Sequence, residues 1–256
     1  MIEARQVLVV IVREVHAKTI LSKSKVSDYT VNPYIGCEHG CTYCYARFMR
    51  TYTGHREAWG EFVDVKSNAP SLLRCEVGKK QVGRVWVSGV CDPYQPVEKR
   101  YELTRKCLEI LLDHGWPVTI QTKSPLVLRD VDLLGGFGDI EVGFTITTAD
   151  EKIRRIFEPD SPSLKARIEA LERLHDVGIK TYVMMAPLLP KAEELPRQLS
   201  RKADYIIIDR MNYHHADWVY RKHRLEYAMA SDFFAQKKIE LASACRSEGI
   251  PCQVLY

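Results

Sequence analysis

The stretch NPYIGCEHGCTYCYARF, residues Asn32–Phe48, places three cysteines within eight positions. Cys37, Cys41 and Cys44 follow the spacing C-x3-C-x2-C, and no fourth cysteine stands nearby. A structural zinc site normally takes four protein ligands, commonly from paired C-x-x-C units. His39 could complete a Cys3His zinc site, but it lies between two of the cysteines and would need an awkward turn. The motif therefore favours a metal or cluster site with one position left open.

Iron–sulfur clusters are the second kind of site that thiolates hold, and a four-iron cluster normally takes four cysteines. Three thiolates leave one iron without a protein ligand, and catalytic metal sites keep such an open position. Gly36 and Gly40 would allow the loop to fold tightly around a bulky cluster. The alternatives are unligated surface cysteines and a zinc knuckle.

The bulk composition is that of a globular protein. The chain has 256 residues, of which 46% are hydrophobic, and this suits one large domain, although the length alone would also allow two smaller ones. The net charge of +4 permits an anionic substrate without requiring one. The apolar run Val7–Val12 is shorter than a signal-peptide core or a membrane span, so we expect an early strand there. We therefore expect a cytoplasmic protein with reduced thiols and no membrane contact.

A junction of helix, glycine and apolar strand repeats along the chain. Leu103–Leu111 has the apolar spacing of a helix, Gly115 follows it, and an apolar run begins three residues later. The same order recurs around Gly178 and Gly249. A glycine in the left-handed conformation commonly ends a helix, so each junction predicts the second half of a βαβ unit.

Six strands are expected from these patterns, with helices filling most of the gaps between them: Tyr29–Asn32, Val85–Ser88, Val118–Thr122, Glu141–Thr147, Thr181–Ala186 and Tyr205–Asp209. Six such units predict an α/β fold with a parallel sheet, either an open doubly wound sheet or a barrel. Ligands bind at the carboxyl ends of the strands in both folds. The cysteine motif follows the first strand and should therefore lie at that functional rim.

The remaining stretches give further expectations about the organisation of the chain. Thr51–Lys80 is a longer excursion between the first two strands, expected to be an insertion or lid. Ser161 is expected to cap the helix before Gly178, with Pro162 in its first turn. No linker or low-complexity tract interrupts the chain. We expect a single domain, 1–256, with a core at about 28–210, an N-terminal extension at 1–27, and a C-terminal helix and strand at 211–256 that cover the barrel.

The cysteine motif, placed between a strand and a helix, resembles the cluster motif of the radical S-adenosylmethionine (SAM) superfamily. Further stretches resemble its spore photoproduct lyase-like branch, often labelled "DNA repair photolyase": YTVNPYIGC at Tyr29–Cys37, CDPYQPVE at Cys91–Glu98, FEP at Phe157–Pro159 and AP at Ala186–Pro187. The resemblance covers the chain from about Lys18 to the end of the last helix. It implies a radical SAM core, a partial (β/α)6 TIM-type barrel with parallel strands.

The resemblance also implies a chemistry. One [4Fe–4S] cluster is held by Cys37, Cys41 and Cys44, and its open iron is chelated by the amino and carboxylate groups of SAM. Reductive cleavage of SAM yields methionine and a 5′-deoxyadenosyl radical, which abstracts hydrogen from the substrate. The electron comes from an external donor of the flavodoxin or ferredoxin type. The branch favours a nucleic-acid lesion or nucleotide as substrate, and the protein positions the cofactors and excludes competing reactions.

Five residues at strand ends are candidates for SAM binding by this resemblance. Lys123 matches a lysine that contacts the SAM carboxylate, and Thr145 and Thr147 match hydroxyl side chains placed against the ribose or methionine. At Ser88 and Gly89 the backbone is expected to accept the SAM amino group. The alternative interpretations are a solvated loop lysine, the ordinary preference of threonine for strands, and a turn that ends a strand.

Three residues are candidates for hydrogen transfer. In spore photoproduct lyase a cysteine just ahead of the corresponding aspartate delivers a hydrogen atom to the product radical. Cys91 directly precedes Asp92, so the register is not identical, and the alternative is a small buried residue. Tyr43 and Tyr45 flank Cys44 and match the family's Tyr-Cys-Tyr motif. They could pack on the cluster or the adenine, or relay a hydrogen atom.

Asn212–Arg224 mixes aromatic and basic side chains after the sixth strand and could contact nucleic acid. The alternative is a surface loop that covers the barrel mouth. Six basic residues could extend such a patch: Lys18, Lys23, Lys25, Arg47, Arg50 and Arg56. Four cysteines lack partner spacing, so no auxiliary cluster is expected: Cys75, Cys107, Cys245 and Cys252. The rival to an enzyme is a non-catalytic nucleic-acid-binding protein stabilised by zinc or an iron–sulfur cluster.

Overall fold

The computed structural model describes residues 10–256, and its main sheet has eight strands. Their spatial order is β2 (Leu21–Lys23), β3 (Tyr29–Val31), β6 (Val85–Val87), β7 (Val118–Thr122), β8 (Ile140–Thr145), β9 (Lys180–Met185), β10 (Tyr205–Ile208) and β11 (Cys252–Val254). Neighbouring strands from β3 to β11 are parallel, and β2 runs antiparallel to β3. All six predicted strands are present, each within two residues of its predicted ends.

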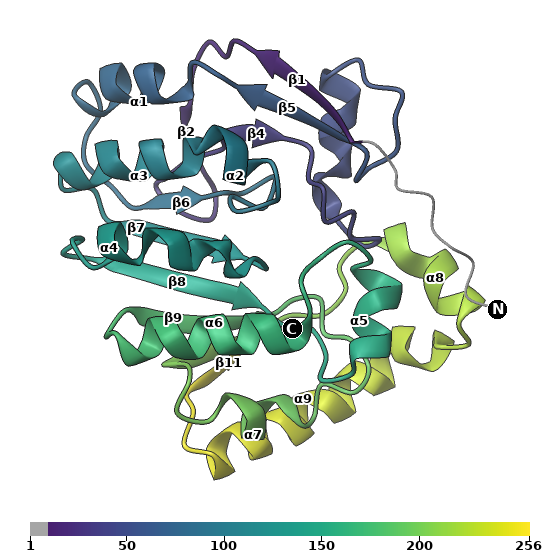
Figure 1. Ribbon diagram of the computed structural model, residues 1–256. Helices are drawn as coiled ribbons and strands as arrows, with labels where there is room; N and C mark the ends of the chain where they lie inside the picture. The colour runs from purple at the N-terminus through teal and green to yellow at the C-terminus, as the bar shows by residue number, and fades with distance from the viewer. Residues whose placement is uncertain (1–9) are drawn as a thin grey trace.

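The order of the strands distinguishes the two predicted architectures. Strands β3, β6, β7, β8, β9 and β10 lie side by side in chain order. A doubly wound sheet reverses its order at a switch point, whereas a barrel winds in one direction. The sheet is not closed, because β2 and β11 form its two edges. The predicted partial TIM-type barrel is therefore confirmed (Figure 1).

Helices and 3₁₀ helices (η) connect the strands: η1 (Tyr45–Tyr52), α1 (Ala69–Val77), α2 (Glu98–Tyr101), α3 (Leu103–Asp113), η2 (Pro125–Asp130), α4 (Val131–Leu134), α5 (Glu151–Phe157), α6 (Leu164–Asp176), α7 (Leu195–Leu199), η3 (His214–Ala216), α8 (Asp217–Lys222), η4 (Glu226–Met229) and α9 (Ser231–Ser247). Helices α3, α4 and α6 lie along one face of the sheet (Figure 1). Helices α5 and α8 instead gather beyond the carboxyl end of β8, on the side where ligands are expected (Figure 1).

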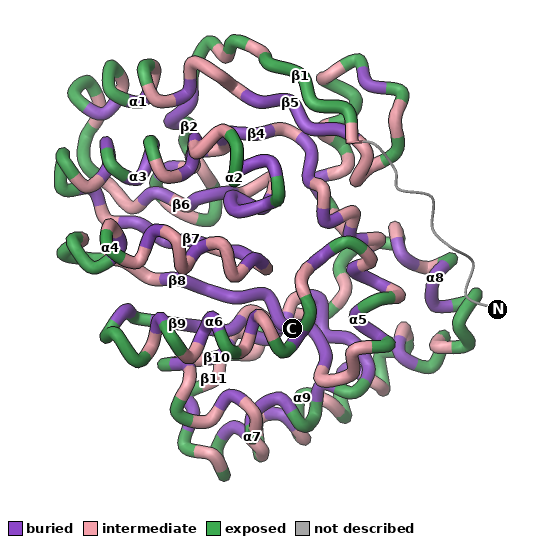
Figure 2. Tube along the Cα trace, in the orientation of Figure 1, coloured by how far each residue is buried: buried purple, intermediate pink, exposed green. Residues whose placement is uncertain are grey.

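Alternation along the strands separates a helix-covered face from the interior of the barrel. On β6, Val85 and Val87 are fully buried and Trp86 between them is only partly buried. On β7, Ile120 is fully buried, whereas Gln121 is partly exposed. Side chains on a strand point alternately to opposite faces, so the buried set packs under the helices and forms the core (Figure 2).

A second, three-stranded sheet is formed by strands from residues 11–66. It consists of β1 (Ile11–Val15), β5 (Phe62–Lys66) and β4 (Tyr34–Ile35), in that spatial order. The early strand predicted at Val7–Val12 begins at Ile11, and residues 7–9 lie outside the described part of the chain. The excursion Thr51–Lys80 supplies β5 and α1. It is therefore a second layer with its own strand and helix.

The three predicted glycine-ended helices are confirmed. Gly115, Gly178 and Gly249 have φ angles of 66°, 80° and 69° and follow α3, α6 and α9. The predicted cap of α6 is wrong by two residues. Ser163 caps that helix and accepts a hydrogen bond from Ala166 N–H at 3.3 Å. Ser161 instead donates to Glu158 O at 2.8 Å, because its hydroxyl is drawn into a buried polar network.

Two tyrosines fill the barrel near the amino ends of its strands. A Cβ at Gly143 would lie 2.1 Å from Cζ of Tyr182, so only glycine leaves room for that ring. The Tyr182 ring stacks on Tyr205, with 5.2 Å between ring centres and 9° between planes. The two rings therefore fill the barrel interior towards the amino ends of the strands.

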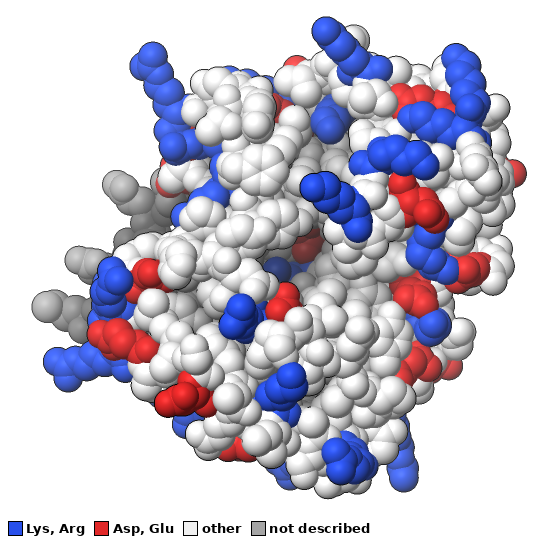
Figure 3. All heavy atoms as spheres, turned by 180° about the vertical axis from the view of Figure 1, so that it is seen from behind, with Lys and Arg blue, Asp and Glu red and all other residues white. Residues whose placement is uncertain are grey.

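Two features of the described chain relate to its predicted organisation, and a third is the shape of its surface. Among residues 10–256, no helix has both the length and the apolar character that a membrane crossing requires. The main sheet takes strands from all three predicted segments, since β2 precedes residue 28 and β11 follows residue 210. The face opposite the one seen in Figure 1 is hollowed near its middle, and basic and acidic atoms lie in the hollow (Figure 3).

Candidate cluster and cofactor site

The cysteine loop runs between β4 and η1 and is folded by its own backbone. Gly40 N–H donates to Cys37 O at 3.2 Å, and Cys44 N–H donates to Cys41 O at 3.1 Å. Gly36 has a φ of +90°, and a Cβ there would lie 2.3 Å from Phe62 O. Glycine is therefore required at position 36, both for its conformation and for its approach to β5.

A glutamine from the loop after β6 holds the start of the cysteine loop. Gln95 is fully buried, and its Nε2 donates to Gly36 O at 3.1 Å. Its Oε1 accepts from Glu38 N–H at 3.0 Å, so the two bonds bracket Cys37 on either side. Glu38 Oε1 in turn accepts from Val97 N–H at 2.6 Å. The position of Cys37 thus depends on a side chain far away in sequence.

Asp92 connects the cysteine loop to the end of β7. Its carboxylate accepts from Thr122 Oγ1 at 2.6 Å and from Lys123 N–H at 2.7 Å, and it lies 3.4 Å from His39 Nδ1. Burial raises the pKa of Asp92, but His39 and these hydrogen bonds outweigh burial and lower the pKa to about 2. His39, the candidate fourth zinc ligand, therefore faces a carboxylate.

The end of α5 holds the second half of the cysteine loop. Thr42 N–H and Thr42 Oγ1 both donate to Phe157 O, at 2.8 and 3.1 Å. Tyr43 OH donates to Glu158 Oε1 at 2.5 Å, and Thr147 Oγ1 donates to the same oxygen at 3.0 Å. The candidates Tyr43 and Thr147, from different parts of the sequence, therefore share one buried carboxylate.

A buried cation compensates this carboxylate. Arg167 Nη2 lies 2.5 Å from Glu158 Oε2, and neither side chain is exposed. Burial raises the pKa of Glu158, but Arg167 and then Lys123 outweigh burial and lower the pKa to about 2. Glu158 is therefore ionised at neutral pH.

Lys123 lies beside the cysteine loop. Its Nζ is 5.7 Å from the centre of the Tyr43 ring. Burial lowers the pKa of Lys123, but its neighbours Cys41 and Glu158 outweigh burial and raise the pKa. An ammonium group at the end of β7, near Cys41, is suitable for binding a carboxylate.

The loop after β6 is organised by an asparagine. Asn32 Oδ1 accepts hydrogen bonds from Ser88 Oγ at 2.7 Å, Gly89 N–H at 2.8 Å and Val90 N–H at 3.0 Å. Tyr45 OH donates to Gly89 O. The carbonyl at which the SAM amino group is expected thus already accepts a bond from Tyr45.

Cys91 lies on the same loop and contacts polar groups. Its Sγ is 3.1 Å from Ser88 Oγ and donates to Tyr34 O at 3.5 Å. Burial raises the pKa of its thiol to about 12. Cys91 also packs against a small apolar cluster that includes Val65 and Val97. These contacts are those of a packing residue. The loop that carries the thiol nevertheless follows the carboxyl end of β6, on the side where ligands are expected.

The backbone and the side chain of Thr145 have different partners: its carbonyl oxygen accepts from Arg167 Nη1 at 2.9 Å. Thr145 lies at the end of β8, where its Oγ1 accepts from Gln121 Nε2 at 2.9 Å. Gln121 Oε1 is buried and has no hydrogen-bond partner within the described residues. Both side chains lie on the interior face of the barrel. Gln121 is two residues before Lys123, and Thr145 is two residues before Thr147.

Four residues that hold the site were not predicted from the sequence: Asn32, Asp92, Gln95 and Glu158. All four belong to stretches quoted above for their resemblance. Gln95 is the fifth residue of Cys91–Glu98, and Glu158 is the second residue of Phe157–Pro159. Nothing in their local spacing shows what they bind. Their partners lie in distant segments, so only the fold brings them to the cysteine loop.

The donor set fits a four-iron cluster. Cys37 and Cys41 are buried and Cys44 is partly buried, all as free thiols. Burial raises the pKa of each of these thiols, and for Cys41 the neighbouring Lys123 opposes the rise. Iron binds thiolates, so loading the site must release protons and supply the positive charge that buried thiolates lack.

The arrangement of the three thiols bears on the zinc alternative. Within residues 10–256, no group of three or more His, Cys, Asp and Glu side chains is arranged to hold a single metal ion. Each thiolate of a four-iron cluster binds a different iron, so its ligands need not converge on one point. Cys37, Cys41 and Cys44 would hold such a cluster.

Comparison with known proteins places the chain in a family. The model of the "Radical SAM superfamily" matches residues 31–197. An uncharacterized protein of Methanocaldococcus jannaschii is 41% identical over 179 residues, which cover 69% of this chain and 67% of that protein. An uncharacterized protein of Acidianus two-tailed virus is 34% identical over 66% of this chain and 59% of its own length. A radical SAM Nα-GlyT isomerase of Pseudomonas phage M6 is 24% identical over 62% of this chain and 32% of its own.

Solved structures share the fold. Spore photoproduct lyase complexed with dinucleoside spore photoproduct has a TM-score of 0.70 at 15% identity, covering 96% of this chain and 82% of that one. Streptococcus suis SuiB bound to S-adenosylmethionine has a TM-score of 0.54 at 15% identity, covering 97% of this chain and 51% of that one. At these identities the likeness concerns the fold.

Proposed function

This chain belongs to the radical SAM superfamily, and we propose that it binds one cluster through Cys37, Cys41 and Cys44 and abstracts hydrogen from a nucleic-acid lesion or nucleotide. The enzyme class and the cofactors follow from the family, whose members use a [4Fe–4S] cluster and SAM. The observation that carries the proposal is the buried three-thiol loop at the carboxyl ends of the strands, with the Lys123 ammonium beside it.

The protein's own residues divide into three roles under this proposal. Cys37, Cys41 and Cys44 hold the cluster, which when bound supplies the electron that splits SAM into methionine and the 5′-deoxyadenosyl radical. Lys123 binds the SAM carboxylate as a point charge. Asn32 fixes the loop of Ser88 and Gly89, where the backbone receives the amino end of SAM.

The remaining candidates would contact other parts of the cofactor or the substrate. Thr145 and Thr147 present hydroxyl groups towards the ribose or methionine, and Thr147 is oriented by Glu158. Tyr43 and Tyr45 flank the third cluster cysteine, and their hydroxyls are fixed by Glu158 and Gly89. They are the candidates for packing on the adenine or relaying hydrogen, and Cys91 is the candidate for returning a hydrogen atom to the product.

The nucleic-acid substrate is supported by a protein of the same fold and by the residues of the rim. Spore photoproduct lyase, which shares the fold, was solved with a dinucleoside spore photoproduct. Aromatic and basic side chains of Asn212–Arg224 follow β10 at the same rim. This combination of side chains is typical of single-strand binding.

The electron is proposed to come from an external flavodoxin or ferredoxin, since radical SAM enzymes need an external donor. We place the protein in the cytoplasm, where thiols stay reduced before cluster loading. The division into a 28–210 core with flanking 1–27 and 211–256 segments also remains our proposal. The chain spans little more than half the length of several relatives that it matches, so the activity, substrate and partners of the whole protein are likewise proposals.

The experiment that tests the enzyme against its rival is an anaerobic turnover assay. Protein reconstituted with iron and sulfide should be brown, and after reduction with dithionite it should convert SAM into 5′-deoxyadenosine and methionine. Chromatography with mass detection measures both products. A colourless, zinc-loaded protein that leaves SAM intact would instead support the non-catalytic nucleic-acid-binding protein.

A further inference from the structure

Three aromatic rings from two distant segments form a nearly parallel stack at the rim. The ring centres of Tyr45 and Tyr213 are 5.9 Å apart with 23° between planes. Tyr213 and His215 follow at 5.8 Å with 4° between planes. We call these three residues the ring stack. Tyr45 begins η1, directly after the cluster cysteine Cys44, whereas the other two follow β10.

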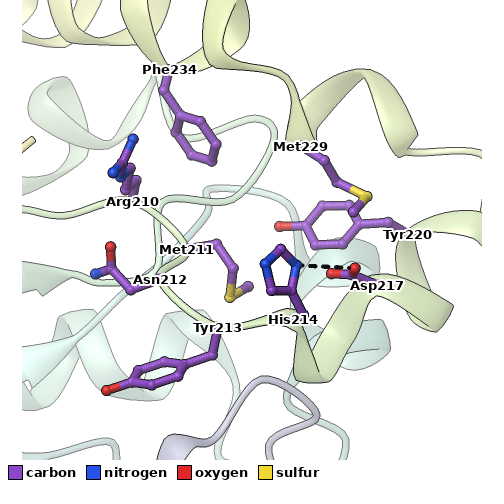
Figure 4. A pocket seen from close by; sticks show the side chains of 9 residues that line it. All are labelled: Arg210, Met211, Asn212, Tyr213, His214, Asp217, Tyr220, Met229 and Phe234. Carbon is purple, nitrogen blue, oxygen red and sulfur yellow. Dashed lines mark hydrogen bonds and ion pairs between the residues drawn. The ribbon is translucent and has the colours of Figure 1, made fainter.

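The ring stack is open to solvent. Tyr45 is 45% exposed and Tyr213 is 50% exposed. Figure 4 shows Tyr213 at the edge of a pocket of about 230 Å³, with its ring turned away from Tyr220 and Phe234, which also line that pocket. The ring of Tyr213 therefore makes no part of the core. Its stacking partners are the other two rings.

The ring stack is tied directly to the cofactor site. Tyr45 OH donates to Gly89 O, and Gly89 belongs to the loop proposed to receive the amino end of SAM. A planar group added to the stack would therefore lie next to the place where the radical is generated. Exposed aromatic residues such as Tyr227 lack this connection.

The charge around the ring stack suits a phosphate backbone. Residues 45–57 contain three basic residues, Arg47, Arg50 and Arg56, and one acidic residue, Glu57, whose carboxylate pairs with His55. Arg210 follows β10 immediately before the second segment of the stack. Two acidic side chains of that segment are engaged by neighbours: Asp209 accepts from Asn212 Nδ2 at 2.8 Å, and Asp217 pairs with His214 at 3.2 Å.

His215 is suited to stacking as a neutral ring. Burial and then the nearby Arg47 lower its pKa, so the imidazole is neutral at pH 7. A neutral planar ring offers a π face without repelling the cationic arginines. The three rings thus present aromatic faces, and the cation Arg47 lies near the His215 end of the stack.

We propose that Tyr45, Tyr213 and His215 form a stacking site for an unpaired base of single-stranded or locally opened nucleic acid, which delivers the neighbouring nucleotide to the cofactor site. This inference rests on the proposed function and specifies how its substrate is held. Every base has a π face, so stacking is tolerant of sequence, and arginines such as Arg47 bind phosphates. A duplex buries its base faces and offers none to the stack.

The test is fluorescence anisotropy of a labelled single-stranded DNA 12-mer with the cluster-loaded protein under anaerobic conditions. Tyr213→Ala removes the middle ring, on which Tyr45 and His215 are both stacked, so the outer rings lose the support that holds them ready for a base. Binding should weaken by about 5- to 150-fold, the range found when one stacking aromatic is removed. Tyr213→Phe keeps the ring and should bind within about twofold of the unmodified protein. Tyr227→Ala is the matched control, an exposed tyrosine outside the ring stack, and should also leave binding unchanged.

Two further measurements make the outcome decisive. The same 12-mer in duplex form should bind more weakly than the single strand, and Arg50→Ala should reduce the dependence of the single-strand affinity on salt. Equal affinity of Tyr213→Ala and unmodified protein, or absent single-strand binding, overturns the proposal. Tyr213-dependent binding of a labelled aromatic peptide with no binding of DNA overturns it too and indicates a protein substrate.

The same samples separate this inference from the proposed function. The unmodified protein should form 5′-deoxyadenosine from SAM when no substrate is present. Intact SAM cleavage together with absent DNA binding would reject the stacking site and keep the enzyme. Absence of SAM cleavage in the unmodified protein would reject the enzyme itself.

Discussion

Glu158 and Arg167 form a fully buried ion pair with 2.5 Å between Oε2 and Nη2. Glu158 also accepts hydrogen bonds from Tyr43 and Thr147, two of the candidates for the cofactor site. The pKa of Glu158 is lowered to about 2 from its ordinary 4.5. Because the folded protein binds this proton less tightly than the unfolded chain, the pair stabilises the fold above pH 4.5 and loses that effect as the pH falls towards 2.

The first prediction is a pH-dependent difference between unmodified protein and Glu158→Gln. At pH 7 the variant should be less stable by about 3 kcal/mol, because Arg167 is left buried without its counter-ion. The difference should shrink as the pH falls below 4.5, since glutamine does not titrate and Glu158 does. Urea unfolding of both proteins in cluster-free form, followed by circular dichroism, measures it. A difference that stays constant from pH 7 to 3 would contradict the assigned pKa.

The second prediction concerns the cluster ligands. Cys41→Ala should abolish the four-iron absorbance and SAM cleavage together, because the described loop offers no other thiol. Cys75→Ala is the matched control, since Cys75 is an exposed free cysteine on α1. It should keep full iron content and activity. Iron analysis, visible absorption and 5′-deoxyadenosine formation are the measurements, and full cleavage by Cys41→Ala would remove that residue from the ligand set.

The third prediction concerns the binding of SAM. Lys123→Ala should keep the cluster and weaken SAM binding by about 10- to 100-fold, the value of one charge-assisted hydrogen bond to a carboxylate. Lys152→Ala, on the exposed start of α5, should bind SAM normally. Titration of the cluster-loaded proteins with SAM gives both affinities. An unchanged SAM affinity in Lys123→Ala would show that Lys123 does not bind SAM and only packs against Tyr43.

The fourth prediction concerns Gln95, whose side chain brackets Cys37. Gln95→Leu leaves the buried Gly36 O and the partly buried Glu38 N–H without their partner, and an unmade bond of a buried group costs about 1–3 kcal/mol. The cysteine loop should therefore lose its shape, and the cluster should be released faster to an iron chelator. Gln81→Leu, an exposed glutamine before β6, is the control. Equal release rates in the two variants would show that the loop does not depend on Gln95.

The fifth prediction separates the two roles of Cys91. Cys91→Ala should retain SAM cleavage, because its Sγ contacts Ser88 and Tyr34 and holds no proposed cofactor group. Product formed from a lesion-containing oligonucleotide then distinguishes the roles. Loss of the product with intact SAM cleavage supports return of a hydrogen atom from the thiol. Normal product assigns Cys91 to packing, and Tyr43 and Tyr45 become the candidates for that step.

The regular part of the fold could be predicted because its signals are local. Apolar runs and helix-ending glycines such as Gly115 depend on neighbours in sequence, and the predicted strands are all present. The second sheet was missed because β4 has only two residues and β5 lies in a segment without a clear pattern. The helix cap was placed at Ser161 because serine at either position would suit the role, and the competing bond to Glu158 is visible only in the fold.

The cofactor site could be predicted only in part for a similar reason. The three proposed cluster ligands share one loop, and their spacing alone made them candidates. The residues that position this loop act over long separations: Gln95 reaches Glu38 across 57 positions, and Glu158 reaches Tyr43 across 115. Spacing in one sequence carries no information about such pairs.

The anchoring of the cysteine loop by late segments has a consequence for biosynthesis. Cys37, Cys41 and Cys44 emerge early from the ribosome, whereas the bonds that shape their loop come from Gln95 and from Phe157. In a nascent chain that ends before Phe157, the cysteine loop lacks the two hydrogen bonds that Phe157 O accepts from Thr42. Maturation should therefore proceed from a folded barrel, and delivery of iron to the shorter nascent chain would meet thiols that are not yet in place.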